Sequence, residues 1–142
     1  MSTEEGKTAP AAVIVLDSIR RDTQAEEDGK WRPSFEWPEV VKYRLRPLRY
    51  GPFQTALRLK MRELVRKYKR GIPPEIEGAA LGELYGQFLV VDWSGFDVKH
   101  SKANAIKTLG DPLFLKVRLD IEACLNTEED DDVEYVEDAL KN

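Results

Sequence analysis

The sequence contains few residues of the kinds that support covalent or metal chemistry. Among 142 residues there is one cysteine and one histidine, so neither a disulfide within the chain nor a cysteine-based metal site can form. A lone thiol is typical of proteins in a reducing compartment, which predicts a cytoplasmic location. The chain also lacks a glycine-rich phosphate loop and a Gly-Lys-Ser motif, so we expect no cofactor.

Long hydrophobic runs are missing as well. No apolar stretch approaches the roughly 18 residues that a membrane-spanning helix needs. The apolar run nearest the N-terminus, Ala11–Leu16, is also too short for the core of an export signal. We therefore expect a protein that neither crosses a membrane nor carries a signal peptide.

The few titratable candidates do not form a catalytic pattern. His100 follows a polar turn, which predicts a solvated side chain, and Asp92 beside Trp93 is read as a turn or helix-end carboxylate. The acidic run at residues 128–132 lacks the glycine and the spaced oxygen ligands of a calcium loop. We predict no catalytic residues and no metal site.

Charge is strongly segregated along the chain, although the formal net charge is only -4. Residues 42–70 contain eleven Lys or Arg and a single acid, Glu63. Residues 126–142 contain eight acids and a single cation, Lys141. This distribution predicts a basic middle and a solvated acidic tail.

Two short runs have the pattern of β-strands. Residues Ala11–Leu16 are apolar and partly β-branched, and Val40–Leu45 alternates apolar Val41, Tyr43 and Leu45 with cations. We predict that the two runs pair as a two-stranded antiparallel ribbon. Since a lone ribbon is only marginally stable, it should pack on the following helix.

The remaining apolar spacing is mostly helical. The clearest stripe runs from Phe53 to Tyr68, after the break at Gly51-Pro52 and before the stop at Gly71. Small residues in the next helix should allow close helix approach, and an apolar stripe of Phe114, Val117, Ile121, Cys124 and Leu125 predicts a final amphipathic helix. The expected helices cover residues 53–68, 75–91, 101–109 and 111–125.

These elements predict an α+β fold that is predominantly α-helical, with a short two-stranded β-ribbon followed by about four helices. Residues 1–10 should be a mobile N-terminus, 11–125 one folded domain and 126–142 a disordered acidic tail. Residues 20–30 are expected to be a loop. Aromatic residues Trp31, Phe35 and Trp37, separated by prolines, should hold an irregular segment on the core.

Two features leave alternatives open. The cations of the predicted helix at 53–68 and of the residues just after it form a basic patch: Arg58, Arg62, Arg66, Lys67 and Lys69. They either contact phosphates or an acidic protein, or form a solvated face balanced by the acidic tail of this chain or of a neighbour. Similarly, Trp93 and Phe96 around Ser94-Gly95 are either core anchors at a corner or an exposed binding site.

Several short motifs occur in an order that carries a resemblance. They are Trp31, RLRPL at 44–48, the basic amphipathic helix at 53–70, DWSGF at 92–96, KANAIKTLGDPLF at 102–114, and an acidic tail ending in Lys141-Asn142. This order resembles that of the tail assembly chaperones of long-tailed bacteriophages and prophages, of the siphophage type. The resemblance covers most of the chain from about residue 30 onward, and the order matters more than any single motif.

The resemblance implies a non-catalytic binding protein made during infection. Such chaperones bind the tape measure protein, help recruit major tail tube subunits, self-associate, and leave before the virion is complete. It implies a host-cytoplasmic protein without membrane or nucleic-acid partners, and a longer product made by ribosomal frameshifting. Combined with amphipathic helices, it places the client contact on Trp93, Phe96, Phe114, Val117 and Ile121.

Two other classes remain alternatives. A nucleic-acid-binding phage accessory protein would use the basic 42–70 segment, and its binding should weaken steeply with salt. A structural head–tail or tail completion protein would be a permanent component of the particle. An assembly chaperone should show neither salt-sensitive nucleic-acid binding nor permanent presence in the particle.

Overall fold

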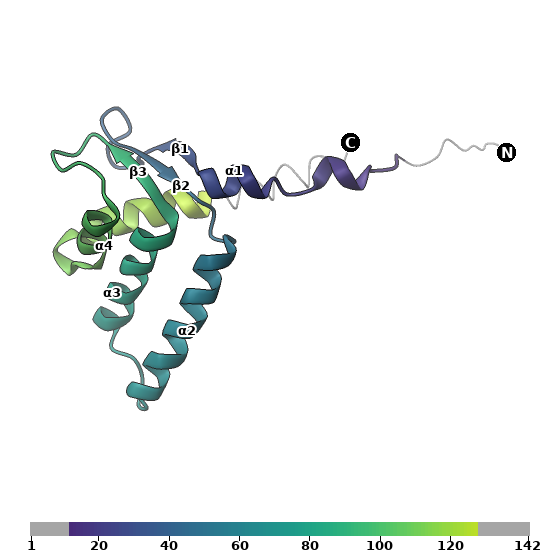
Figure 1. Cartoon of the computed structure of the whole chain (residues 1–142). Coiled ribbons are helices and arrows are strands. Elements are labelled where there is room, and N and C mark those ends of the chain that lie inside the picture. Colours follow the sequence, from purple (N-terminus) through teal and green to yellow (C-terminus); the bar gives the residue numbers. More distant parts are fainter. Residues whose placement is uncertain (1–11, 128–142) are drawn as a thin grey trace.

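The computed structural model describes residues 12–127, in which helices pack around a small three-stranded antiparallel sheet (Figure 1). The predicted fold class, α+β and mainly helical, is confirmed. Our predictions for residues 1–10 and for the acidic run after residue 127 lie outside the described residues. The elements are η1 (Leu16–Ile19), α1 (Thr23–Asp28), β1 (Lys30–Pro33), β2 (Lys42–Leu45), α2 (Gly51–Lys67), α3 (Pro74–Leu84), η2 (Tyr85–Leu89), β3 (Val90–Ser94), α4 (Lys102–Gly110), η3 (Pro112–Phe114) and a final helix over 115–127.

The sheet has the order β1-β2-β3, so β2 lies in the middle. Its alternation is as predicted, because Tyr43 and Leu45 are fully buried whereas Lys42 is exposed. Tyr43 lies opposite Trp93 of β3, which places two large aromatic side chains on the core face of the sheet. The sheet therefore contributes aromatic side chains to the core.

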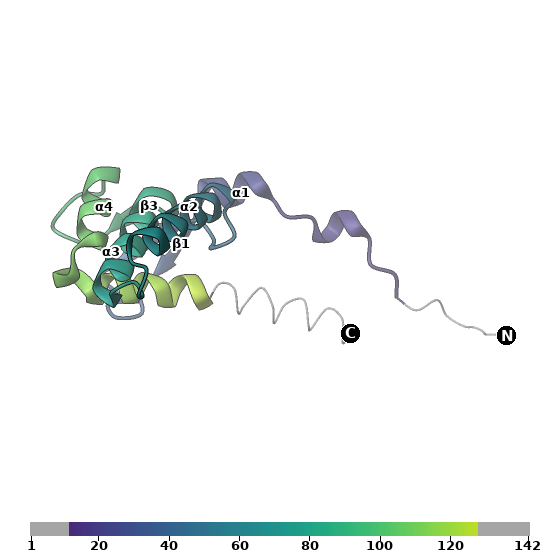
Figure 2. The same cartoon turned by 90° about the horizontal axis from the view of Figure 1, so that it is seen from below.

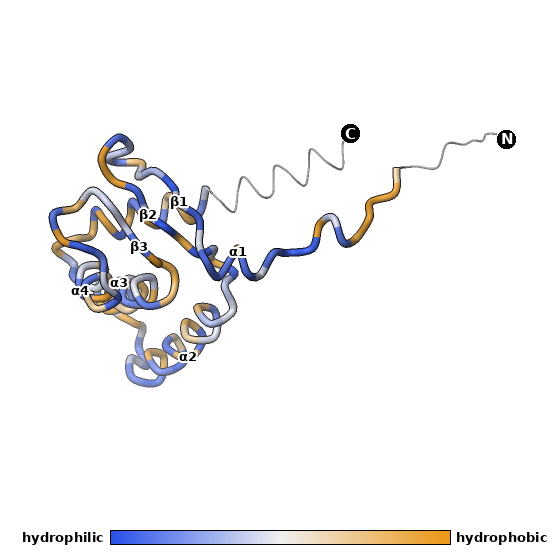
Figure 3. The backbone as a smooth tube through the Cα atoms, turned by 45° about the horizontal axis from the view of Figure 1, so that its top comes forward, coloured by the Kyte–Doolittle hydropathy of each residue, from blue (hydrophilic) through white to orange (hydrophobic). Residues whose placement is uncertain are grey.

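The prediction that Ala11–Leu16 pairs with this strand is wrong. Both edges of β2 are occupied, one by β1 and the other by β3. Residues 12–19 extend away from the body, as two perpendicular views show (Figures 1 and 2). Figure 3 shows hydrophobic residues along this arm, and Val13, Val15, Leu16 and Ile19 are largely exposed.

Residues 20–30, predicted as a loop, contain the short helix α1. The Asp22 side chain accepts a hydrogen bond from the Ala25 amide at its N-terminus, and Gly29 follows it with a φ of 82°. Glu26 joins the helix to the body through an ion pair with Arg49 at 2.7 Å. A capping Asp and a terminating Gly were the sequence signals for this helix.

Helices α2 and α3 form a hairpin that projects from the sheet (Figure 1). The first of them matches the predicted 53–68 helix to within two residues. The second ends at Leu84 and continues as the π-helical turn η2, after which Val90 begins strand β3. The prediction of a helix through Val91 is therefore wrong at its end, because these β-branched residues gain backbone hydrogen bonds with β2 instead.

Two glycines allow α3 and η2 to lie directly against α4. A Cβ atom on Gly82 would overlap the carbonyl oxygen of Leu109, and one on Gly86 would lie 2.6 Å from the Ala105 carbonyl carbon. The predicted close helix approach is confirmed. Glycine is needed here because the backbone of α4 takes the space of a side chain.

The final helix passes behind the sheet in Figure 1 and closes the core. Four members of its predicted stripe are buried: Val117, Ile121, Cys124 and Leu125. The fifth, Phe114, is 47 % exposed, because it lies in η3 before the helix begins. Asp120, a charged residue between the apolar positions of this stripe, is also buried.

Candidate partner-binding surface

Asp120 is the most highly connected polar residue of the core. Its side chain is enclosed, with the residue 3 % exposed. One carboxylate oxygen accepts the backbone amides of Phe35 and Glu36 at 2.9 and 3.0 Å. The other accepts the hydroxyls of Ser34 and Tyr43 at 2.5 and 2.6 Å. This carboxylate therefore fixes the loop after β1 onto the final helix and onto β2 at the same time.

The hydroxyl of Tyr43 acts as the donor in this network. Burial raises its pKa far above the usual value, and the hydrogen bond to Asp120 and the charge of that carboxylate raise it further. Cys124 lies beside the network, with Sγ 3.6 Å from the carbonyl oxygen of Pro33. Burial also raises the pKa of this thiol to about 11, so it is a packing group rather than a nucleophile.

The fixed loop displays one aromatic side chain to solvent. Ser34 is buried and its hydroxyl accepts the Trp37 amide at 2.9 Å, which closes the turn. Phe35 lies between these two anchored residues and is 57 % exposed. Because the Asp120 carboxylate holds its backbone amide, this ring is presented from a rigid base.

Leucines of the final helix extend this exposed surface. Phe35 and Leu119 line one shallow hollow, and Leu115 precedes Leu119 by one helical turn. Leu113 and Phe114 are exposed in the preceding turn. We define the apolar patch as Phe35, Leu113, Phe114, Leu115 and Leu119, each of them more than two-fifths exposed.

A polar pair borders the apolar patch. The Lys116 amine lies 3.3 Å from the Glu36 carboxylate and 5.8 Å from the centre of the Trp37 ring. Exposed apolar side chains on neighbouring turns, with charged groups beside them, are typical of a protein-interaction surface. The arrangement suits contact with the apolar face of another polypeptide.

The residues predicted for client contact lie mainly elsewhere. Trp93, Val117 and Ile121 are buried in the core, so they are not accessible to a partner in this fold. Phe96 is half-buried and packs on the core. Of the predicted five, Phe114 alone belongs to the apolar patch. The other four members of the apolar patch were not predicted, although the leucines were recognisable as apolar residues outside the buried stripe: Phe35, Leu113, Leu115 and Leu119.

No family model matches this chain, and no similar protein was found among curated proteins or solved structures.

The corner formed by Trp93, Ser94, Gly95 and Phe96 is part of the core. This was one of the two alternatives for Trp93 and Phe96. The Trp93 indole nitrogen donates to the Val98 carbonyl oxygen at 2.8 Å, and the Phe96 ring meets Trp93 edge-on at 5.4 Å. Gly95 has a φ of 99°, and a Cβ atom there would overlap the Val40 carbonyl oxygen. The corner therefore closes tightly over the turn that precedes β2.

His100 belongs to this corner rather than to solvent. Its ring packs edge-on against Trp93 at 5.3 Å, and its side chain is 14 % exposed, so the prediction of a solvated histidine is wrong. Its Nδ1 atom lies 3.9 Å from Asp92 Oδ1. Asp92 itself is half-exposed and accepts the Trp93 amide at 2.8 Å. The prediction of a turn or helix-end carboxylate is wrong, because Asp92 lies within strand β3, opposite Arg44 of β2.

The predicted basic patch is exposed on α2 and the turn after it. Its members, Arg58, Arg62, Arg66, Lys67 and Lys69, all point to solvent. Within residues 12–127, none of these five takes part in an ion pair. This basic patch is separate from the apolar patch, since it lies on the projecting hairpin.

The described part of the chain offers no evident metal ligand set. In residues 12–127, no three side chains of His, Cys, Asp or Glu are grouped so that they could hold an ion. Over the same residues, no helix has both the length and the apolarity that crossing a membrane requires.

Proposed function

We propose that this chain is a non-catalytic assembly chaperone of the phage tail type, which binds the apolar, helical tape measure protein. The apolar patch is the observation that carries the proposal. It offers leucines one helical turn apart together with an aromatic ring on a fixed loop, and an amphipathic client helix would match this spacing. The order of sequence motifs supports the same class.

The proposed chaperone acts in the host cytoplasm during tail assembly and leaves before the particle is complete. Its client contact is made by Phe35, Leu115 and Leu119, with Leu113 and Phe114 at the margin. A rigid contact surface lowers the entropic cost of binding, because the loop is already ordered by Asp120. Recruitment of tail tube subunits and self-association belong to the same proposal.

Co-expression tests this function directly. The proposal expects a long helix-rich protein to be encoded immediately downstream of this chain. That downstream protein is produced in bacteria either together with this chain or, as the control, alone. We expect the downstream protein to be soluble and to co-purify in the first case and to aggregate in the second. Purified mature particles should lack the chain by mass spectrometry. Finding it as a resident component would overturn the chaperone in favour of a structural completion protein.

The basic patch favours a second candidate, a nucleic-acid-binding accessory protein. Five exposed cations on one helix and its end provide a row for phosphate contacts. Binding of a duplex DNA probe by the full chain should then fall steeply as salt rises. Absence of binding at low salt, together with co-purification of the downstream protein, would select the chaperone.

A further inference from the structure

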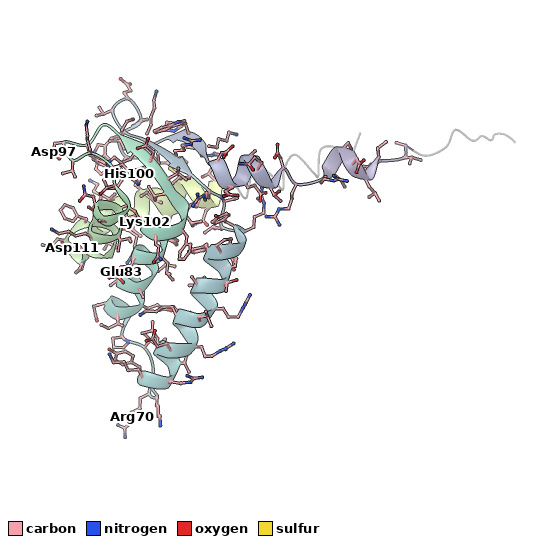
Figure 4. The ribbon with its side chains drawn as sticks, viewed as in Figure 1. Arg70, Glu83, Asp97, His100, Lys102 and Asp111 are labelled. Atoms are coloured by element: carbon pink, nitrogen blue, oxygen red, sulfur yellow. The ribbon has the colours of Figure 1, made fainter. Side chains whose placement is uncertain are left out.

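The basic patch has a regular geometry on α2. Arg58, Arg62 and Arg66 follow at four-residue intervals, so they form one row along the helix. Lys67, the residue after Arg66, and Lys69, just beyond the end of the helix, add positive charge near the tip of the hairpin. At that tip, Arg70 points away from the body (Figure 4).

Within residues 12–127, no acid forms an ion pair with this row. Glu63 is the only acid within α2, and it pairs with Lys60 at 3.3 Å rather than with the row. Like charges one turn apart on a helix repel each other. An acidic segment placed along the row would therefore be attracted to it and would stabilise the helix.

The chain itself contains a segment of matching composition. Residues 128–142 carry eight acids and one lysine. Among the acids, Val133, Val136 and Leu140 are spaced by three and four positions. Helix α2 also exposes two apolar side chains, Leu59 and Val65, between its cations. The segment and the helix thus complement each other in both charge and apolar character.

The segment is long enough to reach the row within one molecule. Its fifteen residues start after residue 127 and can extend to roughly 50 Å. Helix α2 is about 25 Å long, and a body of about 100 residues has a radius of gyration near 13 Å. A tethered segment of this length has an effective concentration in the millimolar range, which favours the same chain over a second copy at micromolar concentration.

We propose that the basic row of α2 is a docking surface for the acidic segment 128–142 of the same chain. Docking covers the cations that would otherwise bind polyanions. It also leaves the apolar patch, which lies on a different part of the fold, unaffected. The inference is independent of the proposed chaperone function, because it concerns a different surface and is tested without a client.

Zero-length crosslinking with a carbodiimide tests the contact in the full chain. We expect amide links from Lys67 and Lys69 to acids in 128–138 at low salt, and their loss at about 1 M salt, where the Debye length is about 3 Å. The yield should not change on dilution. Equal links to Lys99, Lys102 and Lys107, which are exposed elsewhere, would overturn the docking site, and a yield that falls with dilution would assign the segment to a second copy.

Charge reversal provides the matched variants. R58E/R62E/R66E should abolish the links to Lys67 and Lys69, whereas K99E/K102E/K107E should retain them. Circular dichroism establishes that each variant is folded. If the first variant does not fold, a neutralised variant replaces it, in which the acids of 128–138 are changed to Asn or Gln. This variant leaves the sequence of residues 12–127 unchanged.

Polyanion binding by that neutralised variant gives an independent readout. In the proposed arrangement, it should bind a 30-base-pair duplex DNA probe at least tenfold more tightly than the unchanged chain in 50 mM salt, because the row is uncovered. An affinity equal to that of the unchanged chain would overturn the proposal. Tight binding by the unchanged chain would instead show that the row is open to nucleic acid.

Discussion

The Tyr43 hydroxyl donates to Asp120 Oδ2 at 2.6 Å and so joins the middle strand of the sheet to the final helix across 77 positions of sequence. The other oxygen of the same carboxylate holds the backbone of Phe35. The Asp120 carboxylate therefore holds both the core and the loop that presents the apolar patch. A change at Asp120 should affect both stability and the presentation of the patch.

Replacing Asp120 by Ala should lower the free energy of unfolding by about 3–5 kcal/mol, because buried hydroxyl and amide donors lose their acceptor. Urea denaturation monitored by tryptophan fluorescence measures this loss. Asp97→Ala, at an exposed loop carboxylate (Figure 4), is the control and should change stability by less than about 0.5 kcal/mol. A loss below about 1 kcal/mol for Asp120→Ala would contradict the assigned network.

Gly82→Ala should destabilise the protein by about 2 kcal/mol or more, because the new methyl group overlaps the Leu109 carbonyl and forces α3 away from α4. Gly51→Ala is the matched control, since nothing lies within 4 Å of a Cβ atom at that helical position. The control should be neutral or slightly stabilising. Thermal unfolding of both variants makes the comparison, and equal melting temperatures would refute the close contact.

Cys124 should react slowly with iodoacetamide in the folded protein. Burial holds its pKa at about 11, so little thiolate exists near neutral pH and the reagent has no access. The unfolded thiol ionises near 9.0, so the folded state should lose stability as the pH rises from about 9 toward 11. Mass spectrometry before and after adding denaturant measures the reaction. Rapid labelling of the native chain at pH 7.5 would contradict this environment.

Glu26 should make the attachment of α1 dependent on pH. Its hydrogen bond from Arg21 lowers the pKa below the usual 4.5, and Arg49 acts in the same direction. A carboxylate with a lowered pKa stabilises the fold above about 4.5, and this contribution disappears as the pH falls through the folded value. The protection factors of residues 23–28 in amide hydrogen exchange, which are corrected for the intrinsic rate at each pH, should therefore fall in acid. Glu26→Gln should exchange rapidly already at pH 6, whereas an unchanged profile would show that the pairing is unimportant.

Much of the helical architecture could be predicted because its signals are local. The stripe of α2 and the alternation of β2 both appear within one short window of sequence. The tight packing at Gly82 and Gly86 also followed from composition. The apolar Ala11–Leu16 run has strand character too, but β2 had no free edge for it in this fold.

The features that define the candidate surface depend on distant residues. Asp120 occupies a polar position of an amphipathic helix, and its donors lie 77 to 86 residues away, so no local pattern predicts its burial. The first two residues of strand β3, Val90 and Val91, were assigned to a helix because their partner strand lies far back in the sequence. Phe35 does lie in an irregular segment, but the prediction that its ring packs on the core is wrong, because the side chain is 57 % exposed on the loop that the Asp120 carboxylate holds.

Client binding by a patch variant tests the central claim most directly. Leu119→Gln removes an exposed leucine of the apolar patch, and Val65→Gln changes an exposed apolar residue on α2 that lies outside it. Both variants should keep the stability of the unchanged chain. In co-purification with the downstream helix-rich protein, Leu119→Gln should retain less than about one-tenth of the bound client, the loss expected for about 1.4 kcal/mol, whereas Val65→Gln should retain all of it. Equal recovery with the two variants would show that the apolar patch is not the client-binding surface.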